Sequence, residues 1–209
     1  MKCIFRTIAT IQPQTVQRYT DYWETIRPRT WHEKWKRWVF AFCSIRTGWK
    51  TNKQTYKLLV DNPWATREQL RDLLEKSKIG IYEKRTKGIW GFTEAILDNP
   101  DILNAQPNVE ERDKLVKKFY GIGITKVAFS LEMCYPTECK VVCLDSHCCS
   151  MFGLDSNKIS ESQYKECERQ WVKSCETMGY PSAIVRHILW DKIQKKRNTR
   201  YWSHVLEST

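Results

Sequence analysis

The sequence predicts an all-α protein, and three observations support this prediction. Apolar residues recur at spacings of three and four along most of the 209-residue chain, which is the period of a helix face. Residues typical of helix caps stand at the starts of several of these stretches. No long run of alternating apolar and polar residues, the usual mark of a half-buried strand, is seen. A hydrophobic fraction of 41% is enough for a packed core.

The first strongly periodic stretch is aromatic. Four large rings fall at spacings of four, three and four residues, on one face of a helix: Trp31, Trp35, Trp38 and Phe42. We expect this stripe to lie in the core rather than to form a platform that stacks on bases, because a helix usually buries its apolar face.

Cap and turn residues mark the next boundaries. A helix that contains Tyr56 and Leu59 is predicted to end at Asp61-Asn62-Pro63, where proline cannot continue it. Thr66 then caps a new helix, because Gln69 stands three residues later and completes a capping box.

The remaining elements follow the same signals. The helix over residues 80–97 carries Gly88 and Gly91 in its interior, and these are expected to break or kink it. The short apolar run 141–144 is the best candidate for an extended segment. Further helices are predicted over residues 108–120, from the Gly121–Gly123 turn to about 135, from the Ser160 cap onward, and over 182–196.

The charge balance points to an anionic partner. The net charge is +11 and the pI is about 9.2, and nucleic acid is the commonest partner of such chains. Ten tryptophans and nine tyrosines add rings that can fill a core or stack on bases.

Cysteine usage and the N-terminal sequence bear on location. The nine cysteines are odd in number and irregular in spacing, so we expect buried thiols in a reducing compartment rather than a disulfide framework. No signal peptide and no membrane-spanning stretch is recognised, so we expect an intracellular protein that does not bind a membrane.

The most informative motif is a glycine hairpin between two helices. Phe119-Tyr120-Gly121-Ile122-Gly123 ends one helix, and Ile124-Thr125-Lys126-Val127-Ala128 begins the next. The glycines permit positive φ, and the start of the second helix points N–H groups outward, which suits a phosphate. Further on, Val141-Val142-Cys143-Leu144 leads to Asp145 and His147. Asp145 can also be read as an ordinary helix N-cap.

This order of features resembles the helix-hairpin-helix DNA glycosylases, with the motif at about 113–134. The resemblance implies a single domain over 1–209 with two helical lobes, lobe A at about 1–45 plus 105–209 and lobe B at about 46–104. It implies a monomer that binds double-stranded DNA and acts on an extruded nucleotide, with Asp145 as the catalytic carboxylate. The implied phosphate contacts are Gly121, Gly123, Ile124 and His147.

The resemblance leaves the presence of a lysine nucleophile open. Lyase-competent members carry a lysine two residues after the second glycine, and here that position is Thr125. A one-residue insertion in the hairpin would instead align Lys126, which lies about 100° further round the helix. The ungapped alignment keeps Val127 and Leu131 in register, so we expect Thr125 in the pocket, Lys126 as a phosphate contact and no lyase activity.

The polar segment 44–52 corresponds to the loop that, in glycosylases, wedges into the duplex and contacts the lesion. Its candidate residues are Arg46, Thr47, Trp49, Lys50 and Asn52. The segment 82–85 is similar to a Tyr-x-Lys-Arg stretch of the archaeal oxoguanine glycosylases, although a charge run is usually a solvated helix face.

Two other functions remain open. The segment 44–52 also resembles an Arg- and Thr-containing motif of phage enzymes that remodel thymine, which implies group transfer onto a pyrophosphorylated 5-hydroxymethyl pyrimidine on the same scaffold. A non-catalytic DNA-binding module is the third possibility, and Asp145 argues against it. Some glycosylases of the family hold an iron–sulfur cluster, but the cysteines after Asp145 do not match that spacing: Cys148, Cys149, Cys167 and Cys175. We therefore expect no cluster, no metal and no cofactor.

Overall fold

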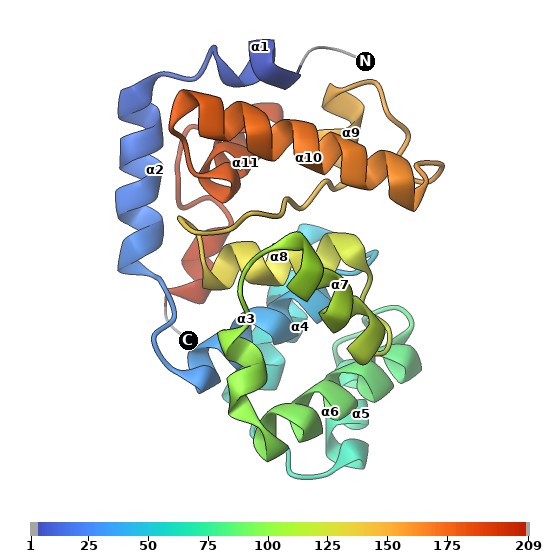
Figure 1. Cartoon of the computed structure of the whole chain (residues 1–209). Coiled ribbons are helices and arrows are strands. Elements are labelled where there is room, and N and C mark those ends of the chain that lie inside the picture. Colours follow the sequence, from blue (N-terminus) through green and yellow to red (C-terminus); the bar gives the residue numbers. More distant parts are fainter. Residues whose placement is uncertain (1–3, 208–209) are drawn as a thin grey trace. The chain divides into compact units, whose positions relative to one another are not determined.

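The computed structural model describes residues 4–207, and within that range it contains helices and no strand (Figure 1). The all-α prediction is therefore confirmed. The α-helices are α1 Ile4–Ile8, α2 Pro13–Thr25, α3 Trp31–Cys43, α4 Trp49–Asp61, α5 Arg67–Lys76, α6 Tyr82–Asp98, α7 Val109–Lys118, α8 Ile124–Cys134, α9 Ser146–Met151, α10 Glu161–Met178 and α11 Ser182–Ile193. Two 3₁₀ turns, Pro100–Asn104 and Ser203–Leu206, complete the described elements.

The chain forms two compact units. The first unit comprises Met1–Arg27, Pro107–Val109 and Leu131–His204, and the second comprises Pro28–Gln106, Glu110–Ser130 and Val205–Thr209. This division assigns α3, α7 and the glycine hairpin to the second unit, whereas the sequence analysis places them in lobe A. Both α3 and the end of α7 pack on α6: Trp38 stacks on Phe92 with ring centroids 5.1 Å apart, and Phe119 contacts the same ring at 5.0 Å.

Aromatic side chains fill the core of the second unit. Trp38 and Phe42 of α3 are buried, as expected for the stripe. Trp35 is only half-buried, and Trp31, in the first turn of α3, remains 43% exposed. The capping box predicted at Thr66 is present, since its hydroxyl accepts a hydrogen bond from the Gln69 N–H and the Gln69 side chain accepts one from the Thr66 N–H.

Helix α6 runs through both of its glycines as one helix, so the expected break is absent. A Cβ at Gly88 would lie 2.8 Å from the carbonyl oxygen of Tyr120 and 3.0 Å from the ring of Phe42. Gly88 therefore allows a close approach between α6 and the backbone that leads into the hairpin. At Gly91 a Cβ would meet nothing within 4 Å.

These surroundings predict opposite effects for the same substitution at the two glycines. Gly88→Ala should destabilise the fold by about 1–3 kcal/mol, because backbone atoms must move to accept the methyl group. Gly91→Ala should leave stability unchanged or raise it by up to about 1 kcal/mol, because alanine favours a helix. Urea denaturation of the two variants measures the difference, and equal stabilities would contradict the close packing at Gly88.

The first unit is built around the long helices α10 and α11. The capping box predicted at Ser160 and Gln163 begins α10, and Gly179, with φ of 69°, ends it. Trp171 of α10 is fully buried and contacts Phe152 edge to face, with centroids 5.7 Å apart. Helix α11 ends at Ile193, three residues before the predicted end at 196.

All eight cysteines that the structure describes are buried thiols, and Cys3 lies outside the described residues. Burial raises the pKa of Cys43 to about 12 and that of Cys149 to about 11, so these thiols stay protonated at neutral pH. A separate observation concerns membranes: within residues 4–207 no helix has the length and apolar character needed for a membrane span.

Candidate active site

The segment before Asp145 is buried and belongs to no helix or strand. Val141 to Leu144 are each at most 3% exposed, and buried N–H groups need acceptors. Side chains accept from three of these N–H groups, and the Val142 carbonyl oxygen also accepts from the Leu144 N–H at 3.0 Å. The Val142 N–H donates to Glu168 Oε1 (2.9 Å), the Cys143 N–H to Glu132 Oε1 (2.8 Å) and the Leu144 N–H to the Tyr164 hydroxyl (3.2 Å).

An ion pair anchors one of these acceptors. Arg186 of α11 donates from Nε (2.9 Å) and Nη2 (2.6 Å) to Glu132 Oε2, and both side chains are buried. Burial would lower the pKa of Arg186, but the Glu132 carboxylate and the nearby Cys143 and Cys148 together outweigh burial and raise it, so the guanidinium stays charged. The pair and the Cys143 N–H together fix the backbone just before Asp145.

Both carboxylate oxygens of Asp145 are engaged by donors. Oδ1 accepts from the Cys148 N–H at 3.0 Å, which makes Asp145 the N-cap of α9. Oδ2 accepts from the indole Nε1–H of Trp190 at 3.0 Å. A carboxylate oxygen has two lone pairs, so each oxygen can still face a ligand. The cap interpretation and the catalytic interpretation are therefore compatible, and the carboxylate is held from α9 and α11 at once.

Aromatic rings pack around Trp190 within the first unit, and a cation lies against one of them. The edge of His147 faces Trp190 with centroids 6.1 Å apart, and Tyr201 stacks on it, also at 6.1 Å. The Lys196 ammonium lies 4.4 Å from the Tyr201 ring centroid. Lys196 belongs to a segment, residues 192–200, that we name the basic tail segment. Its exposed cations are Lys192, Lys195, Lys196, Arg197 and Arg200.

The hairpin belongs to the second unit. Gly121 has φ of 79°, a conformation that favours glycine, whereas Gly123 does not have positive φ, contrary to the expectation for both. Gly123 instead stands at the start of α8, where its carbonyl accepts from the N–H groups of Lys126 (2.9 Å) and Val127 (3.0 Å). Gly123 is exposed and Ile122 is buried, so the turn is anchored by Ile122 and presents its glycines to solvent.

Comparison with proteins of known structure identifies the fold. No family model matches the chain, and no curated protein matches its sequence. Three solved structures match at high probability. The 8-oxoguanine DNA glycosylase of Thermotoga maritima has a TM-score of 0.74 at 15% identity, over 92% of this chain and 96% of that one. The chain has the fold of the helix-hairpin-helix 8-oxoguanine DNA glycosylases.

The other two structures agree. The Methanocaldococcus jannaschii 8-oxoguanine glycosylase/lyase in complex with a 15mer DNA containing 8-oxoguanine has a TM-score of 0.73 at 16% identity, covering 87% of this chain and 90% of that one. A second structure of the M. jannaschii 8-oxoguanine DNA glycosylase gives 0.73 at 15% identity, over 92% of each chain. The predicted resemblance to this fold, including its archaeal members, is confirmed.

Within this glycosylase fold, the lysine register remains a prediction. Thr125 and Lys126 are both half-buried in the first turn of α8. The Lys126 ammonium lies 5.3 Å from the ring centroid of Phe129, one helical turn further on. His147 was predicted, together with the hairpin, to contact phosphate. It is exposed on α9, in the first unit.

The predicted wedge loop of the glycosylase fold is held from inside by Arg85. This side chain is buried, which lowers the pKa of its guanidinium. It donates to the carbonyl oxygens of Phe42 and Ile45 and, at 2.6 Å, to the Thr47 hydroxyl. Thr47 thus has a structural role in this loop. The segment 82–85 is also not wholly a solvated face, because Arg85 points inward.

The other wedge candidates divide by exposure. Arg46, with φ of 47°, and Lys50 are exposed and free to face a ligand. Trp49 is half-buried, with its ring edge-on to Phe40 at 6.3 Å. Asn52 is only 4% exposed, so it is a poor candidate for insertion into a duplex.

Trp190, Glu132 and Arg186 are the site residues that sequence reasoning missed. Trp190 falls within the predicted helix 182–196, but no motif connects it with Asp145, 45 residues earlier. In residues 4–207, no group of three or more His, Cys, Asp or Glu side chains is arranged to hold a metal ion.

Proposed function

We propose that this protein is a DNA N-glycosylase that acts on a flipped-out modified or damaged base, with Asp145 as its catalytic carboxylate. The observation that supports this most strongly is the placement of Asp145. Two donors, the Cys148 N–H and the Trp190 indole, fix its oxygens at the end of a buried segment. The shared fold with 8-oxoguanine DNA glycosylases supports the same reaction class.

The chemistry needs a fixed negative charge near the sugar. As the base departs, positive charge develops on the sugar ring, and a carboxylate stabilises that charge or orients the attacking water. A carboxylate already held in place needs no reorganisation during the reaction, which is the usual source of electrostatic catalysis. The target base must leave the stack, because its reacting atoms are inaccessible within a duplex.

Cationic and N–H groups on both units support binding to double-stranded DNA. The second unit presents the exposed hairpin glycines and the first turn of α8, and the first unit presents the basic tail segment. Helix N-termini and lysine or arginine side chains are the usual partners of backbone phosphates. With a net charge of +11, we expect affinity to fall steeply with added salt.

Gly123→Asp should weaken binding to all DNA sequences alike. A Cβ at Gly123 meets nothing within 4 Å, and aspartate is a favoured N-cap, so the fold should tolerate the change. The new carboxylate would repel the phosphate, and the slope of log affinity against log salt should fall by about one. Gly80→Asp adds the same charge at another exposed, open glycine and is the control. Equal binding by both variants would exclude the hairpin as an anchor.

A test for lyase activity distinguishes whether Thr125 or Lys126 occupies the position of the nucleophile at the start of α8. With Thr125 in the pocket, the wild-type protein should form no adduct with DNA on borohydride reduction, because no amine reaches the sugar. Lys126→Ala should then lower affinity slightly and leave base release intact. An adduct that forms with the wild type and disappears in Lys126→Ala would contradict this and assign Lys126 as the nucleophile.

The substrate is found by direct assay. Duplexes with one 8-oxoguanine, deaminated, alkylated or phage-type modified base are incubated with the protein, and released bases are detected by mass spectrometry. Release of a free base supports the proposal. If an amine donor is supplied and the base stays in the DNA with added mass, the protein catalyses group transfer and the glycosylase proposal is wrong.

A further inference from the structure

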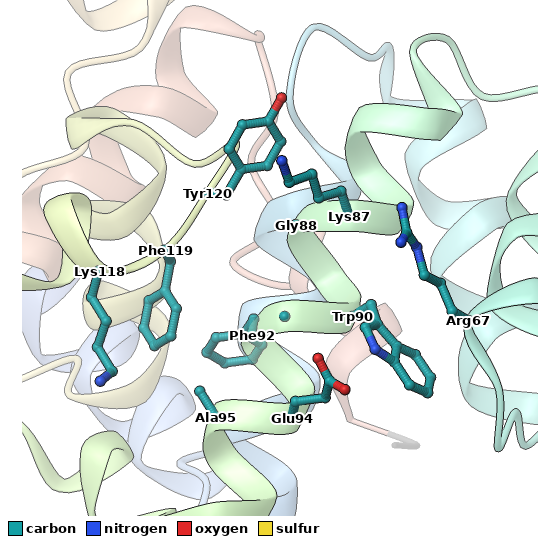
Figure 2. Close-up of a pocket in the computed structure, with 11 residues that line it drawn as sticks. Arg67, Lys87, Gly88, Trp90, Phe92, Glu94, Ala95, Lys118, Phe119 and Tyr120 are labelled. Atoms are coloured by element: carbon teal, nitrogen blue, oxygen red, sulfur yellow. The ribbon is translucent and has the colours of Figure 1, made fainter.

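A pocket of about 410 Å³ lies in the second unit beside the hairpin (Figure 2). Helix α6 forms its floor, the end of α7 with the residues that lead into Gly121 forms one side, and Arg67 of α5 stands on the other. Its volume is within the range of about 300–1,000 Å³ that small-ligand sites occupy. The proposed base-release chemistry is centred on Asp145 and does not use this pocket.

The rim of this pocket is cationic. Arg67, Lys87 and Lys118 line it, against the single carboxylate of Glu94. Among the described residues, none of the three cations forms an ion pair with a carboxylate, whereas many other lysines and arginines of the chain do. Three cations against one carboxylate give the hollow a net positive charge, which favours an anionic ligand.

Two accessible rings line the same pocket. Tyr120 is 49% exposed and Trp90 is half-buried. Figure 2 shows the Lys87 ammonium directed at the face of Tyr120, with its nitrogen 4.3 Å from the ring centroid. A cation and a ring in contact can bind a phosphate and the base attached to it together.

The floor is open because α6 carries Gly91 there. A Cβ at Gly91 would meet nothing within 4 Å, so the space above this residue belongs to the pocket. The glycine costs α6 helix stability, and close approach of a ligand to the backbone is a common reason for such a residue.

We propose that this pocket binds an unpaired nucleotide of the same DNA whose phosphate the hairpin contacts. Tyr120 directly precedes Gly121, so a strand bound at the hairpin passes next to the pocket. The nucleotide must be unpaired, because stacking on Tyr120 or Trp90 requires a free base face. The proposal rests on the proposed function, since it assumes that the hairpin binds DNA.

The test compares two fluorescein-labelled DNAs, a blunt duplex and the same duplex with a short oligothymidine overhang. Anisotropy titration of the wild-type protein should show roughly tenfold tighter binding of the overhang DNA, in line with the strength of base–aromatic stacking. Gly91→Met, which fills the pocket from its floor without changing charge, should abolish this gain and leave blunt-duplex affinity unchanged. Equal binding of the two DNAs by the wild type would overturn the proposal.

Matched variants on α6 test the cationic rim. Lys87→Gln should reduce the overhang gain, whereas Lys84→Gln, an exposed lysine on the same helix that does not line the pocket, should preserve it. Equal loss in both variants would show a general charge effect and overturn the site. Competition by thymidine monophosphate at concentrations comparable to the DNA would identify a free-nucleotide site and overturn the assignment to DNA.

The two proposals fail in different ways. If the hairpin does not bind DNA, Gly123→Asp leaves the blunt-duplex affinity unchanged. Failure of the pocket proposal would appear as an overhang gain that is absent from the wild type or untouched by Gly91→Met.

Discussion

Asp145→Asn is expected to reduce turnover on a confirmed substrate by about 10³-fold or more while DNA binding is retained or tightens. The substitution removes the negative charge that stabilises the developing sugar cation in the transition state. In the ground state that charge only repels nearby phosphates, so its loss does not weaken binding. Single-turnover base release and anisotropy titration measure the two effects separately.

The fold of this variant should be intact, which makes the result interpretable. Asparagine is as good an N-cap as aspartate, so the bond from the Cys148 N–H can persist. Asp155→Asn, at an exposed aspartate outside the site, is the matched control and should keep full activity. Full activity in Asp145→Asn would exclude the glycosylase mechanism and leave group transfer or a binding role.

Trp190→Phe separates the position of the carboxylate from its charge. It keeps an aromatic ring on α11 but removes the indole donor to Asp145 Oδ2. We expect a smaller loss in the rate of base release than in Asp145→Asn, with affinity unchanged, because the charge remains but its orientation is no longer fixed. A variant with wild-type rates would show that the indole bond does not position the carboxylate.

Local signals in the sequence predicted much of the fold. The capping boxes at Thr66 and Ser160 fix the starts of α5 and α10 because their hydrogen bonds join residues only three apart. The hairpin and Asp145 were recognised for a similar reason, since short motifs carry turn geometry and caps within a few residues.

Contacts between distant residues could not be predicted in this way. Arg85 reaches carbonyl groups about 40 residues earlier, and Glu132 pairs with Arg186 across 54 residues. Arg186 stands in no motif, and the stretch that contains Arg85 gives no sign that its side chain is buried, because an arginine in a helical stretch is ordinarily solvated. The glycines of α6 show the same limit, because the tight approach at Gly88 and the open floor at Gly91 depend on what packs opposite them.

The buried ion pair beneath Asp145 leads to the largest expected stability effect. Arg186 is 2% exposed and the Glu132 side chain is fully buried, so removing the arginine leaves a carboxylate with no opposing charge. Breaking one partner of such a pair typically costs about 3–5 kcal/mol. The cost should be felt at Asp145 as well, because Glu132 Oε1 holds the Cys143 N–H two residues before it.

Arg186→Met should therefore lower the free energy of unfolding by about 3–5 kcal/mol at neutral pH, measured by urea denaturation. The deficit should shrink as the pH falls, because protonation of Glu132 removes the buried charge and favours the folded variant. The double variant Glu132→Gln, Arg186→Met removes both charges, keeps an acceptor for the Cys143 N–H and should recover part of the loss. Arg169→Met, which breaks an exposed pair with Glu166, is the control and should change stability little. If Arg186→Met is no less stable than Arg169→Met, the buried pair does not support the Asp145 segment.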